Sequence, residues 1–416
     1  TSDPDGGPST AVALARAVGL GADLVHPVNG RAAVAIGGSL RPLPAGTLMG
    51  VPGDLGALDG LAVADAGRDR DDGRPLLAAG ADTTIGELVR RRLGDDVVAH
   101  LVDPMLGGVY AGNADAISLR MAVPALADAA TGQHTLTAAV RAAAASRKAP
   151  AGTPVFTTVV GGLGRLVEAV AGRLAAAGVT IHCGTSVTRI DRAGRRWMVN
   201  AGTGGHRLRL PADGIVLAVP TPAAAAMLPA VAALPLRYAS VALVTLALPA
   251  PRLPDLSGLL IPSDQGYAVK AATFFDVKWA HLRRADRISP VRVSIGRFGD
   301  EAQLARDDGD LVMLAHRELS ELIGTSLPAP VAAKVFRWPD SLPQYPTGHA
   351  GRVAELRAAL DPTLAVAGAG YDGIGIPVCV RSGYQAAEAV AAAVGPVGGP
   401  VVGPAAGAVV GVGPTM

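Results

Sequence analysis

A glycine-rich segment near the end of the chain has residue types and spacing that could support chemistry. In LAVAGAGYDGIGIPVCVRSGYQAAEAV, residues 364–390, a short apolar run is followed by several glycines and then by Ile376-Pro377. Proline is well tolerated in the first turn of a helix, so the sequence predicts a helix that begins near Pro377. Glycine costs chain entropy and contributes no packing, so its repeated use predicts a backbone that something approaches closely.

Two interpretations of this segment stay open from the spacing alone. The free N–H groups and the dipole of a helix point outward from its first turn. A flat, electron-accepting ring would gain from donors aimed at its carbonyl edge, and a reduced flavin carries negative charge at that edge. The alternative is a glycine-rich turn between packed elements.

The bulk composition narrows the class of protein. The chain has 416 residues, which predicts two domains or more, and half of them are hydrophobic. The net charge of +2 gives no reason to expect a nucleic-acid partner. Two cysteines, Cys183 and Cys379, form no disulfide framework and no metal-ligand pattern, so we expect a reducing compartment and no metal.

The first half of the chain shows strand and helix signals that could position such a site. Residues 31–46, RAAVAIGGSLRPLPAG, predict a β-hairpin with Gly37-Gly38 at the turn. Thr84 and Glu87 fit a helix capping box. The apolar positions after it have helical spacing, and we expect Asp103-Pro104 and Gly107-Gly108 to interrupt that helix.

Residues 153–190 predict a strand–helix–strand unit. Gly162-Leu163-Gly164 opens its helix, but Val167 stands where a dinucleotide-binding motif has its third glycine. We therefore favour a tight connection over a phosphate-binding loop. Residues 238–300 are rich in strand signals and predict a separate sheet, and the Gly- and Pro-rich end of the chain predicts a flexible tail rather than a membrane span.

Seven segments of the chain carry a family resemblance. They are LRPLPAGTLMGVP (40–52), LVDPMLGGVYAGNADAISLR (101–120), GGLGRLVEAVAGRL (161–174), GLLIPSDQGYAVKAATFFDVKW (258–279), SIGRFGD (294–300), RWPDSLPQYPTGH (337–349) and GYDGIGIPVCVRSGYQAAEAV (370–390). In this order they resemble the protoporphyrinogen and coproporphyrinogen oxidases of the flavin-containing amine oxidase superfamily. The similarity spans roughly residues 20–394 and is greatest to the Gram-positive type, whose substrate is coproporphyrinogen III.

The resemblance implies an α/β fold with a discontinuous, Rossmann-like FAD-binding domain, a mixed-sheet substrate domain and a helical subdomain. The expected ranges are 1–50 as part of the substrate or FAD domain, 51–150 as the helical subdomain, 151–222 and 336–395 as parts of the FAD domain, 223–335 as the substrate domain and 396–416 as a flexible tail.

The resemblance also implies the reaction. Noncovalent FAD would take hydride equivalents from a porphyrinogen, O₂ would reoxidise the flavin with release of H₂O₂, and three rounds would yield the porphyrin for haem biosynthesis. The expected protein is cytoplasmic. A homodimer, peripheral contact with a membrane and transfer of product to a ferrochelatase stay open as partners.

Site residues are carried over position by position, and no catalytic side chain is assigned. The cofactor-binding positions implied by the resemblance are Val187, Trp338, Ala369, Ile374, Gly375 and Ile376. The implied substrate-binding positions are Gly108, Leu260 and Lys270. For three of them a plain structural role stays open: a buried strand valine for Val187, a core aromatic for Trp338 and a surface lysine for Lys270.

The sequence departs from the family pattern in two places. The family begins with a strand, a G-x-G-x-x-G turn and a helix, and none of these precedes Thr1, so we expect an N-terminal unit to be missing and FAD binding to be weak. Some relatives have an arginine near the position of Leu48, which puts one substrate contact in doubt.

Three alternatives to a coproporphyrinogen oxidase remain at this stage. One is a protoporphyrinogen IX oxidase. Another is a flavoenzyme related to amine oxidases or carotenoid desaturases. The last is a flavin-free protein that binds tetrapyrroles, which the expected N-terminal loss keeps open.

Overall fold

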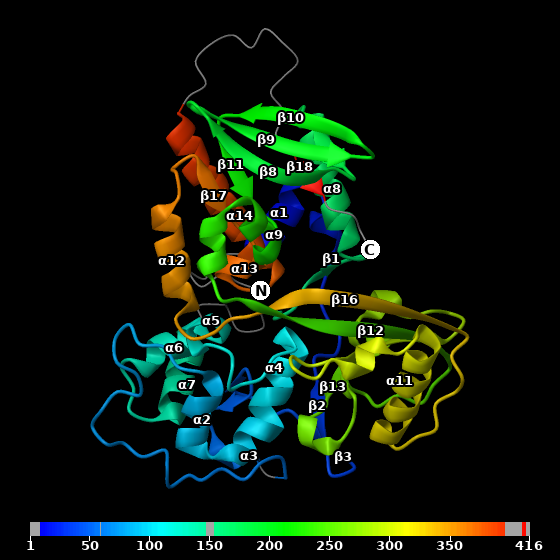
Figure 1. Cartoon of the computed structure of the whole chain (residues 1–416). Coiled ribbons are helices and arrows are strands. Elements are labelled where there is room, and N and C mark those ends of the chain that lie inside the picture. The colour runs from blue at the N-terminus through cyan, green and yellow to red at the C-terminus, as the bar shows by residue number, and fades with distance from the viewer. Residues whose placement is uncertain (1–8, 59, 147–153, 396–409, 413–416) are drawn as a thin grey trace. The chain divides into compact units, whose positions relative to one another are not determined.

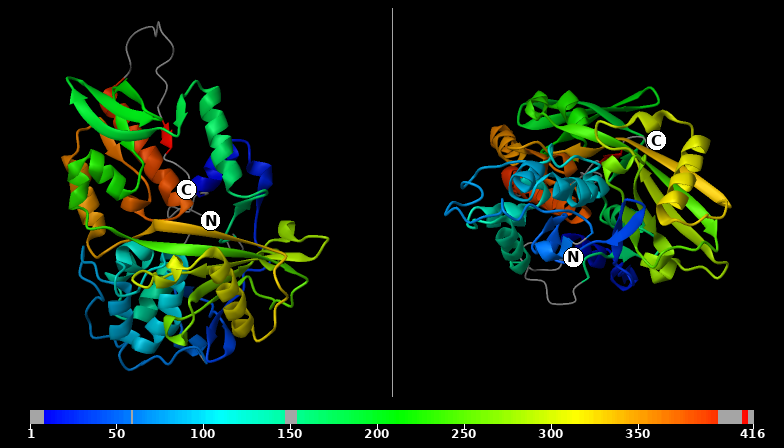
Figure 2. Two further views of the ribbon diagram at one scale, coloured as in Figure 1. Left: turned by 45° about the vertical axis from the view of Figure 1, so that its right-hand side comes forward. Right: turned by 90° about the horizontal axis from the view of Figure 1, so that it is seen from below.

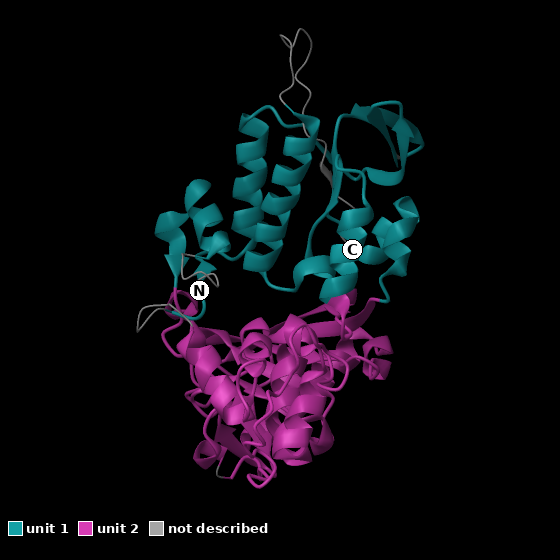
Figure 3. Cartoon of the chain, turned by 90° about the vertical axis from the view of Figure 1, so that its left-hand side faces the viewer, with its two compact units in different colours: residues 1–25, 152–235, 350–416 teal, residues 26–151, 236–349 magenta. Residues whose placement is uncertain are grey.

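The computed structural model describes residues 9–58, 60–146, 154–395 and 410–412 (Figure 1). The chain divides into two compact units (Figure 3). Unit 1 comprises residues 1–25, 152–235 and 350–416, and unit 2 comprises residues 26–151 and 236–349. Each unit is therefore assembled from segments that are far apart in the sequence.

Unit 2 is built around a mixed sheet, which has seven strands among the described residues. Its order is β16-β12-β15-β14-β13-β2-β3, and neighbours are antiparallel except for β13 and β2, which are parallel. Figure 2 shows the long strands β12 and β16 from two further sides. The strands are β2 (Ala32–Ile36), β3 (Ser39–Pro42), β12 (Arg237–Pro249), β13 (Gly258–Leu260), β14 (Val269–Phe274), β15 (Ile288–Ile295) and β16 (Ala332–Gln344).

The hairpin predicted for residues 31–46 is confirmed. β2 pairs with β3 in antiparallel register, with Ile36 opposite Ser39. Gly37 and Gly38 have φ values of 54° and 72°, which suit the two central residues of a type I′ turn. Apolar residues of the sheet pack with α11 (Asp308–Ile323), and they form one buried cluster.

Helices occupy much of residues 85–145 in unit 2. Their core consists of leucine, valine, isoleucine and alanine side chains, many of them fully buried. The helices are α2 (Ile85–Leu93), α3 (Asp95–Val97), a π-helical turn (Val98–Val102), α4 (Asp103–Tyr110), α5 (Leu119–Ala122), α6 (Pro124–Ala130) and α7 (Leu136–Ala145), and α10 (Phe275–Lys278) follows β14.

The predicted interruption of the helix at Asp103-Pro104 and Gly107-Gly108 is wrong. α4 begins at Asp103 with Pro104 in its first turn and continues through both glycines to Tyr110. A proline in that position loses no helical hydrogen bond, because the first N–H groups of a helix have no partner within it. The π-helical turn before α4 connects it to the preceding helical stretch.

In unit 1, helix α14 (Ile376–Val394) packs against β11 (Ile215–Leu217) and β17 (Leu364–Val366), which pair in parallel. The contact is close, because a Cβ on Gly214 would lie 2.3 Å from Val390 Cγ1. The other helices that belong wholly or mainly to this unit are α1 (Thr10–Ala17), α8 (Gly164–Ala176), α9 (Thr221–Met227), α12 (His349–Ala359) and α13 (Ala369–Asp372).

The remaining strands form small sheets. In unit 1, β1 (Leu24–Val25) pairs with β6 (Thr158–Val159), and β7 (Ile181–Cys183) pairs with β18 (Val410–Val412). A three-stranded sheet of the same unit has the order β10 (His206–Ala212), β9 (Arg196–Thr203), β8 (Ser186–Ala193). In unit 2, β4 (Thr47–Leu48) pairs with β5 (Val51–Pro52). Short 3₁₀ turns cover Gly21–Asp23, Leu55–Leu58, Pro229–Ala233, Ser263–Gln265, Ala280–Leu282 and Ala302–Ala305.

The strand–helix–strand unit predicted for residues 153–190 differs from the structure. β6 precedes α8 but pairs antiparallel with β1, whereas β7 pairs with β18, so the two flanking strands belong to different sheets. Hydrophobic periodicity identified the helix correctly, but it carries no information about which strands become neighbours.

The end of the chain is described only in part. Residues 410–412 form β18, and the rest of the predicted tail 396–416 lies outside the described residues. In the described ranges, we find no helix whose length and apolar character would let it cross a membrane. The six expected domain ranges stay predictions, although the described part of the expected helical subdomain 51–150, residues 51–58 and 60–146, falls within unit 2.

Candidate functional site

The glycine segment after β17 adopts backbone conformations that require glycine. Gly368, Gly373 and Gly375 have φ values of 110°, 119° and 114°. L-residues with a side chain rarely adopt such angles, so conformation alone accounts for glycine at these three positions. Between them lies α13, which places Ala369 at its first position, half-buried.

Open space lies in front of part of this backbone. A Cβ on Gly368 or Gly375 would meet no other atom within 4 Å, and Gly375 and Ile376 are exposed while Ile374 is half-buried. The interpretation of a turn enclosed between packed elements does not describe Gly375. The main chain there is accessible to a ligand.

The first turn of α14 has the electrostatic character that an anionic ring edge needs. Gly375 is its N-cap, no side chain caps it within the described residues, and no acidic residue lies in its first turn. Pro377 occupies that turn, as predicted, and its carbonyl accepts a hydrogen bond of 2.7 Å from Thr10 Oγ1. The N–H groups and the positive end of the dipole of this long helix therefore point outward next to the glycines.

A buried hydrogen-bond network fixes the glycine segment to α14. Ser382 is 1% exposed; its hydroxyl accepts from Gly368 N at 3.0 Å and donates to Asp372 Oδ2 at 2.5 Å. Arg357 donates to both oxygens of Asp372 at 2.8 and 2.6 Å, and this hydrogen bonding raises the pKa of Arg357. Sequence reasoning missed these three residues, since only the fold brings Arg357 to the segment.

The two other expected cofactor residues lie on strands. Val187 is half-buried on β8, beside a bulge, and packs against the buried hydrophobic cluster that contains Tyr371. It therefore contributes to the core of unit 1, and its proposed contact with the cofactor stays open. Trp338 lies in unit 2 on β16, opposite Val241, and is 54% exposed. The interpretation of Trp338 as a core aromatic is therefore wrong.

The structure brings the three expected substrate residues together within unit 2. α4 packs against β13 and β14, and a Cβ on Gly108 would lie 3.0 Å from Leu260 Cδ2. Leu260 pairs with Ala271, and Ile261 N donates to Lys270 O at 3.0 Å. Gly108 is exposed and Leu260 half-buried, so a ligand could reach this surface.

Lys270 is not the surface lysine that the sequence favoured. It is 3% exposed and occupies the position skipped in the register of β14 with β15, between Val269 and Ala271. A bulge of this kind redirects a side chain out of the normal alternation of a strand. Burial, with a smaller effect of the nearby positive charge of Arg297, lowers the pKa of Lys270 to about 7.

Lys270 lines a cavity of about 200 Å³ that lies entirely within unit 2. Gly107 and Ile261, the neighbours of Gly108 and Leu260, also line it, as do Asp103 and Arg297. Arg297 belongs to the SIGRFGD segment, but nothing in that segment signalled which side chain would reach Lys270. For Asp103, the sequence predicts only a place in a helix break.

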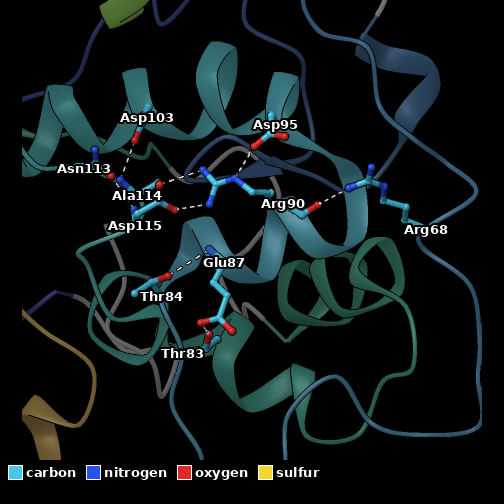
Figure 4. Close-up of polar contacts among 10 residues, drawn as sticks. All are labelled: Arg68, Thr83, Thr84, Glu87, Arg90, Asp95, Asp103, Asn113, Ala114 and Asp115. Carbon is cyan, nitrogen blue, oxygen red and sulfur yellow. Dashed lines mark hydrogen bonds and ion pairs between the residues drawn. The ribbon is translucent and has the colours of Figure 1, made fainter.

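Figure 4 shows how the loop after α4, which supplies Gly112 and Asn113 to the cavity, is held. Asp103 Oδ1 accepts from Ala114 N at 2.7 Å, and burial raises the pKa of Asp103. Arg90 donates to both carboxylate oxygens of Asp115 at 2.6 and 2.9 Å. These contacts set the position of the loop.

Of the two hydrogen bonds of the capping box predicted at the start of α2, the one accepted by the Thr84 side chain is confirmed (Figure 4). Glu87 N donates to Thr84 Oγ1 at 3.1 Å. The Glu87 carboxylate accepts from Thr83 Oγ1 at 2.7 Å. Within the ranges that the structure describes, no three His, Cys, Asp or Glu side chains gather in a way that could hold a metal ion.

Comparison with known proteins agrees with these features. The sequence matches the family described as flavin containing amine oxidoreductase over residues 5–391, and the chain belongs to that family. It is 39% identical to the coproporphyrinogen III oxidase of Mycobacterium tuberculosis (strain ATCC 25618 / H37Rv) over 363 residues, which cover 84% of this chain and 76% of that protein. It is 30% identical to the coproporphyrinogen III oxidase of Bacillus subtilis over 391 residues, 89% of this chain and 81% of that protein.

A solved structure shows the same fold. The crystal structure of a candidate protoporphyrinogen oxidase from Exiguobacterium sp. 255-15 superposes with a TM-score of 0.76 at 28% identity, covering 91% of this chain and 84% of that one. The resemblance inferred from seven segments is thereby confirmed, together with the α/β fold. The missing N-terminal unit stays a prediction.

The family implies a flavin, and the residues of unit 1 fit one. The glycines at 368 and 375 leave space that a Cβ would enter, and the first turn of α14 presents N–H groups without an opposing carboxylate in that turn. A planar, electron-accepting ring with a carbonyl edge suits such a donor set.

Proposed function

We propose that this protein is an FAD-dependent coproporphyrinogen III oxidase of haem biosynthesis. Coproporphyrinogen III and three O₂ would give coproporphyrin III and three H₂O₂. The observation that carries the proposal is the similarity, along most of the chain, to proteins named for that reaction. The glycine segment before α14 supports it independently, since it offers accessible main chain at a helix start.

Unit 1 supplies the cofactor contacts in this proposal. FAD, when bound, provides two-electron oxidation of the substrate with O₂ as the final acceptor. Ile374, Gly375 and Ile376, with Ala369 before them, would lie along the ring, and the dipole of α14 would stabilise negative charge on it. Val187 would contact the adenine end, and Trp338 on β16 stays a proposed cofactor residue.

Unit 2 supplies the substrate contacts. Gly108 would let the tetrapyrrole approach α4, because it carries no side chain, and Leu260 would form an apolar wall. Lys270 would interact with a substrate carboxylate. No side chain is assigned to the redox step. A cytoplasmic location, a homodimer, contact with a membrane surface and transfer to a ferrochelatase stay predictions.

A protoporphyrinogen oxidase is the second candidate, favoured by the description of the Exiguobacterium relative. Purified protein incubated with FAD and either porphyrinogen separates the two, since porphyrin fluorescence and H₂O₂ should rise faster with coproporphyrinogen III. A rise with neither substrate in a protein that retains FAD would refute the proposal. A protein that binds porphyrin but no FAD would instead be the flavin-free alternative.

Gly375→Ala tests the cofactor site directly. The added methyl group would enter the open space before α14 and should weaken FAD binding about tenfold or more, as crowding a well-fitted site typically does. Gly205→Ala is the matched control, because Gly205 also has a positive φ, of 89°, and open space, but lies in the β9–β10 turn. Titration of flavin fluorescence provides the readout; equal weakening in both variants would point to backbone strain alone.

A further inference from the structure

The cavity in unit 2 has the size of a site for a substituent rather than a whole tetrapyrrole. Its volume of about 200 Å³ lies below the roughly 300–1,000 Å³ of pockets that enclose a complete small molecule. α4 contributes Gly107, on which a Cβ would meet no atom within 4 Å, so the glycine keeps this wall open. The surface at Gly108 and Leu260 that we expect to bind the tetrapyrrole lies beside the cavity, because the adjacent residues in the sequence, Gly107 and Ile261, line it.

A buried cation without a partner lines this cavity. Lys270 is 3% exposed, and among the described residues no hydrogen bond or ion pair holds its ammonium group. Buried lysines are rare unless they are paired, because the charged form loses its hydration. Burial, with a smaller effect of Arg297, lowers the pKa of Lys270 to about 7. An anion entering the cavity would supply the missing partner.

Arg297 gives the cavity a second, fixed positive charge. Its guanidinium donates to Ile261 O at 2.9 Å and to Tyr267 O at 3.3 Å, which orient the group and leave further N–H donors. The acidic groups around the two cations are Asp103 from α4, Asp300 after β15 and Glu318 from α11. No ion pair within 4 Å joins any of these five side chains to one another in the described part of the chain.

The acidic neighbours do not cancel the attraction for an anion. Asp103 has a raised pKa because of burial, and its Oδ1 already accepts from Ala114 N. Glu318 accepts from Val269 N at 2.9 Å, and Asp300 is exposed to solvent. The two cations therefore retain capacity for one carboxylate, whose two oxygens match a lysine and an arginine donor.

We propose that this cavity is a carboxylate subsite in which Lys270 and Arg297 bind one propionate arm of the tetrapyrrole, and that it selects substrates with a propionate on every pyrrole ring. The inference rests on the proposed function for the tetrapyrrole itself. The inference goes beyond the proposed function in three respects. It names Arg297 as a substrate residue, it places a specificity determinant at the cavity, and it links substrate binding to the uptake of a proton on Lys270.

The selection follows from the chemistry of the two candidate substrates. Coproporphyrinogen III carries a propionate on each of its four rings, so a carboxylate can enter the cavity in any in-plane orientation of the macrocycle. Protoporphyrinogen IX carries two propionates and two vinyl groups, and the preference requires that the macrocycle be held with one of the vinyl-bearing rings at the cavity, where the vinyl group would lie against both cations. A buried charge left without a partner is strongly disfavoured.

Binding of stable porphyrins to wild-type protein and to Lys270→Met tests the subsite. Coproporphyrin III and mesoporphyrin IX are a matched pair, since mesoporphyrin has ethyl groups in place of two of the propionates. Wild-type protein should bind coproporphyrin about 10- to 100-fold more tightly, the range of one charge-assisted hydrogen-bonded contact. Lys270→Met should reduce that ratio to less than about threefold, and exposed Lys334→Met should leave it unchanged.

Proton uptake provides a second measurement that a merely structural role would not change. Calorimetric titration of wild-type protein with coproporphyrin at about pH 8, in two buffers of different ionisation enthalpy, should show net proton uptake. Lys270→Arg, whose charge is permanent, should retain the preference but lose the uptake. Unchanged ratios in Lys270→Met, or equal weakening of both porphyrins, would overturn the subsite.

These outcomes are distinguishable from failure of the proposed function. Absence of coproporphyrinogen oxidation by a wild-type protein that retains FAD would refute the reaction while the Lys270-dependent porphyrin preference could still stand. Loss of that preference with normal oxidation would refute the subsite alone. Thermal unfolding of each variant shows whether it is folded, and Arg297→Gln provides an independent second variant in which the preference should also fall.

Discussion

Replacing Lys270 with methionine should stabilise the protein at neutral and lower pH, although it removes a proposed ligand-binding group. Methionine has a similar length and no charge, so it can occupy the same buried space. The lysine is 3% exposed, and burial lowers its pKa from 10.5 to about 7. In the unfolded chain, a lysine keeps its ordinary pKa of about 10.4.

The pH dependence follows from this difference. Below pH 7 both states carry the proton, and the folded protein bears the full cost of a buried charge. Between about pH 7 and about pH 10.4 the folded state has released the proton while the unfolded state retains it, so stability rises with pH. At about 1.36 kcal/mol per unit, the shift corresponds to a cost of about 5 kcal/mol at low pH, as an upper bound.

Urea unfolding of the wild type, Lys270→Met and Lys334→Met at pH values from about 6 to about 10 measures this effect. Lys270→Met should exceed the wild type by about 3–5 kcal/mol at the acidic end and lose most of that advantage at the alkaline end, whereas the Lys334 variant should follow the wild type. A Lys270→Met variant that is less stable at low pH, or that parallels the wild type throughout, would refute the reasoning, since the ammonium would then have a partner.

Three further changes give separate outcomes. Gly108→Ala should weaken coproporphyrin binding, because the new Cβ would lie 3.0 Å from Leu260 Cδ2 and push that side chain, while the helix preference for alanine, about 1 kcal/mol, offsets part of the cost of this contact; normal binding would contradict this. Arg90→Met should cost about 1 kcal/mol at low salt and less at high salt, as urea midpoints will show. Ser382→Ala should cost about 1–3 kcal/mol and weaken FAD retention, checked by thermal unfolding and flavin titration.

Local signals predicted local structure. Gly37-Gly38 predicted the β2–β3 hairpin, because a two-residue turn needs two positive φ values. Thr84 predicted the start of α2, because a hydroxyl can accept from the N–H three residues later. Pro377 predicted the start of α14 for an equally local reason.

Pairings between distant segments could not be read from the same signals. β6 and β7 flank α8 as predicted, but their partners are β1 and β18. The cavity is a similar case, since Asp103, Lys270 and Arg297 come from three separate segments. The family resemblance pointed to Lys270 as a substrate residue. The burial of its side chain, however, depends on a β-bulge that the sequence AVKAATFF does not predict.

The loss of folding stability caused by burying Lys270 is itself evidence that this residue has a role in ligand binding. A structural lysine on a sheet normally extends its ammonium to water or pairs it with a carboxylate, and Glu318 is close enough on α11 to accept from the neighbouring Val269 N. Lys270 has neither arrangement within the described residues. Its side chain instead lines a cavity beside a second cation that carbonyl oxygens hold in place. Two buried cations kept together without a direct ion pair destabilise the folded protein, and a bound carboxylate would reduce that destabilisation, so ligand binding should stabilise the wild type more than Lys270→Met.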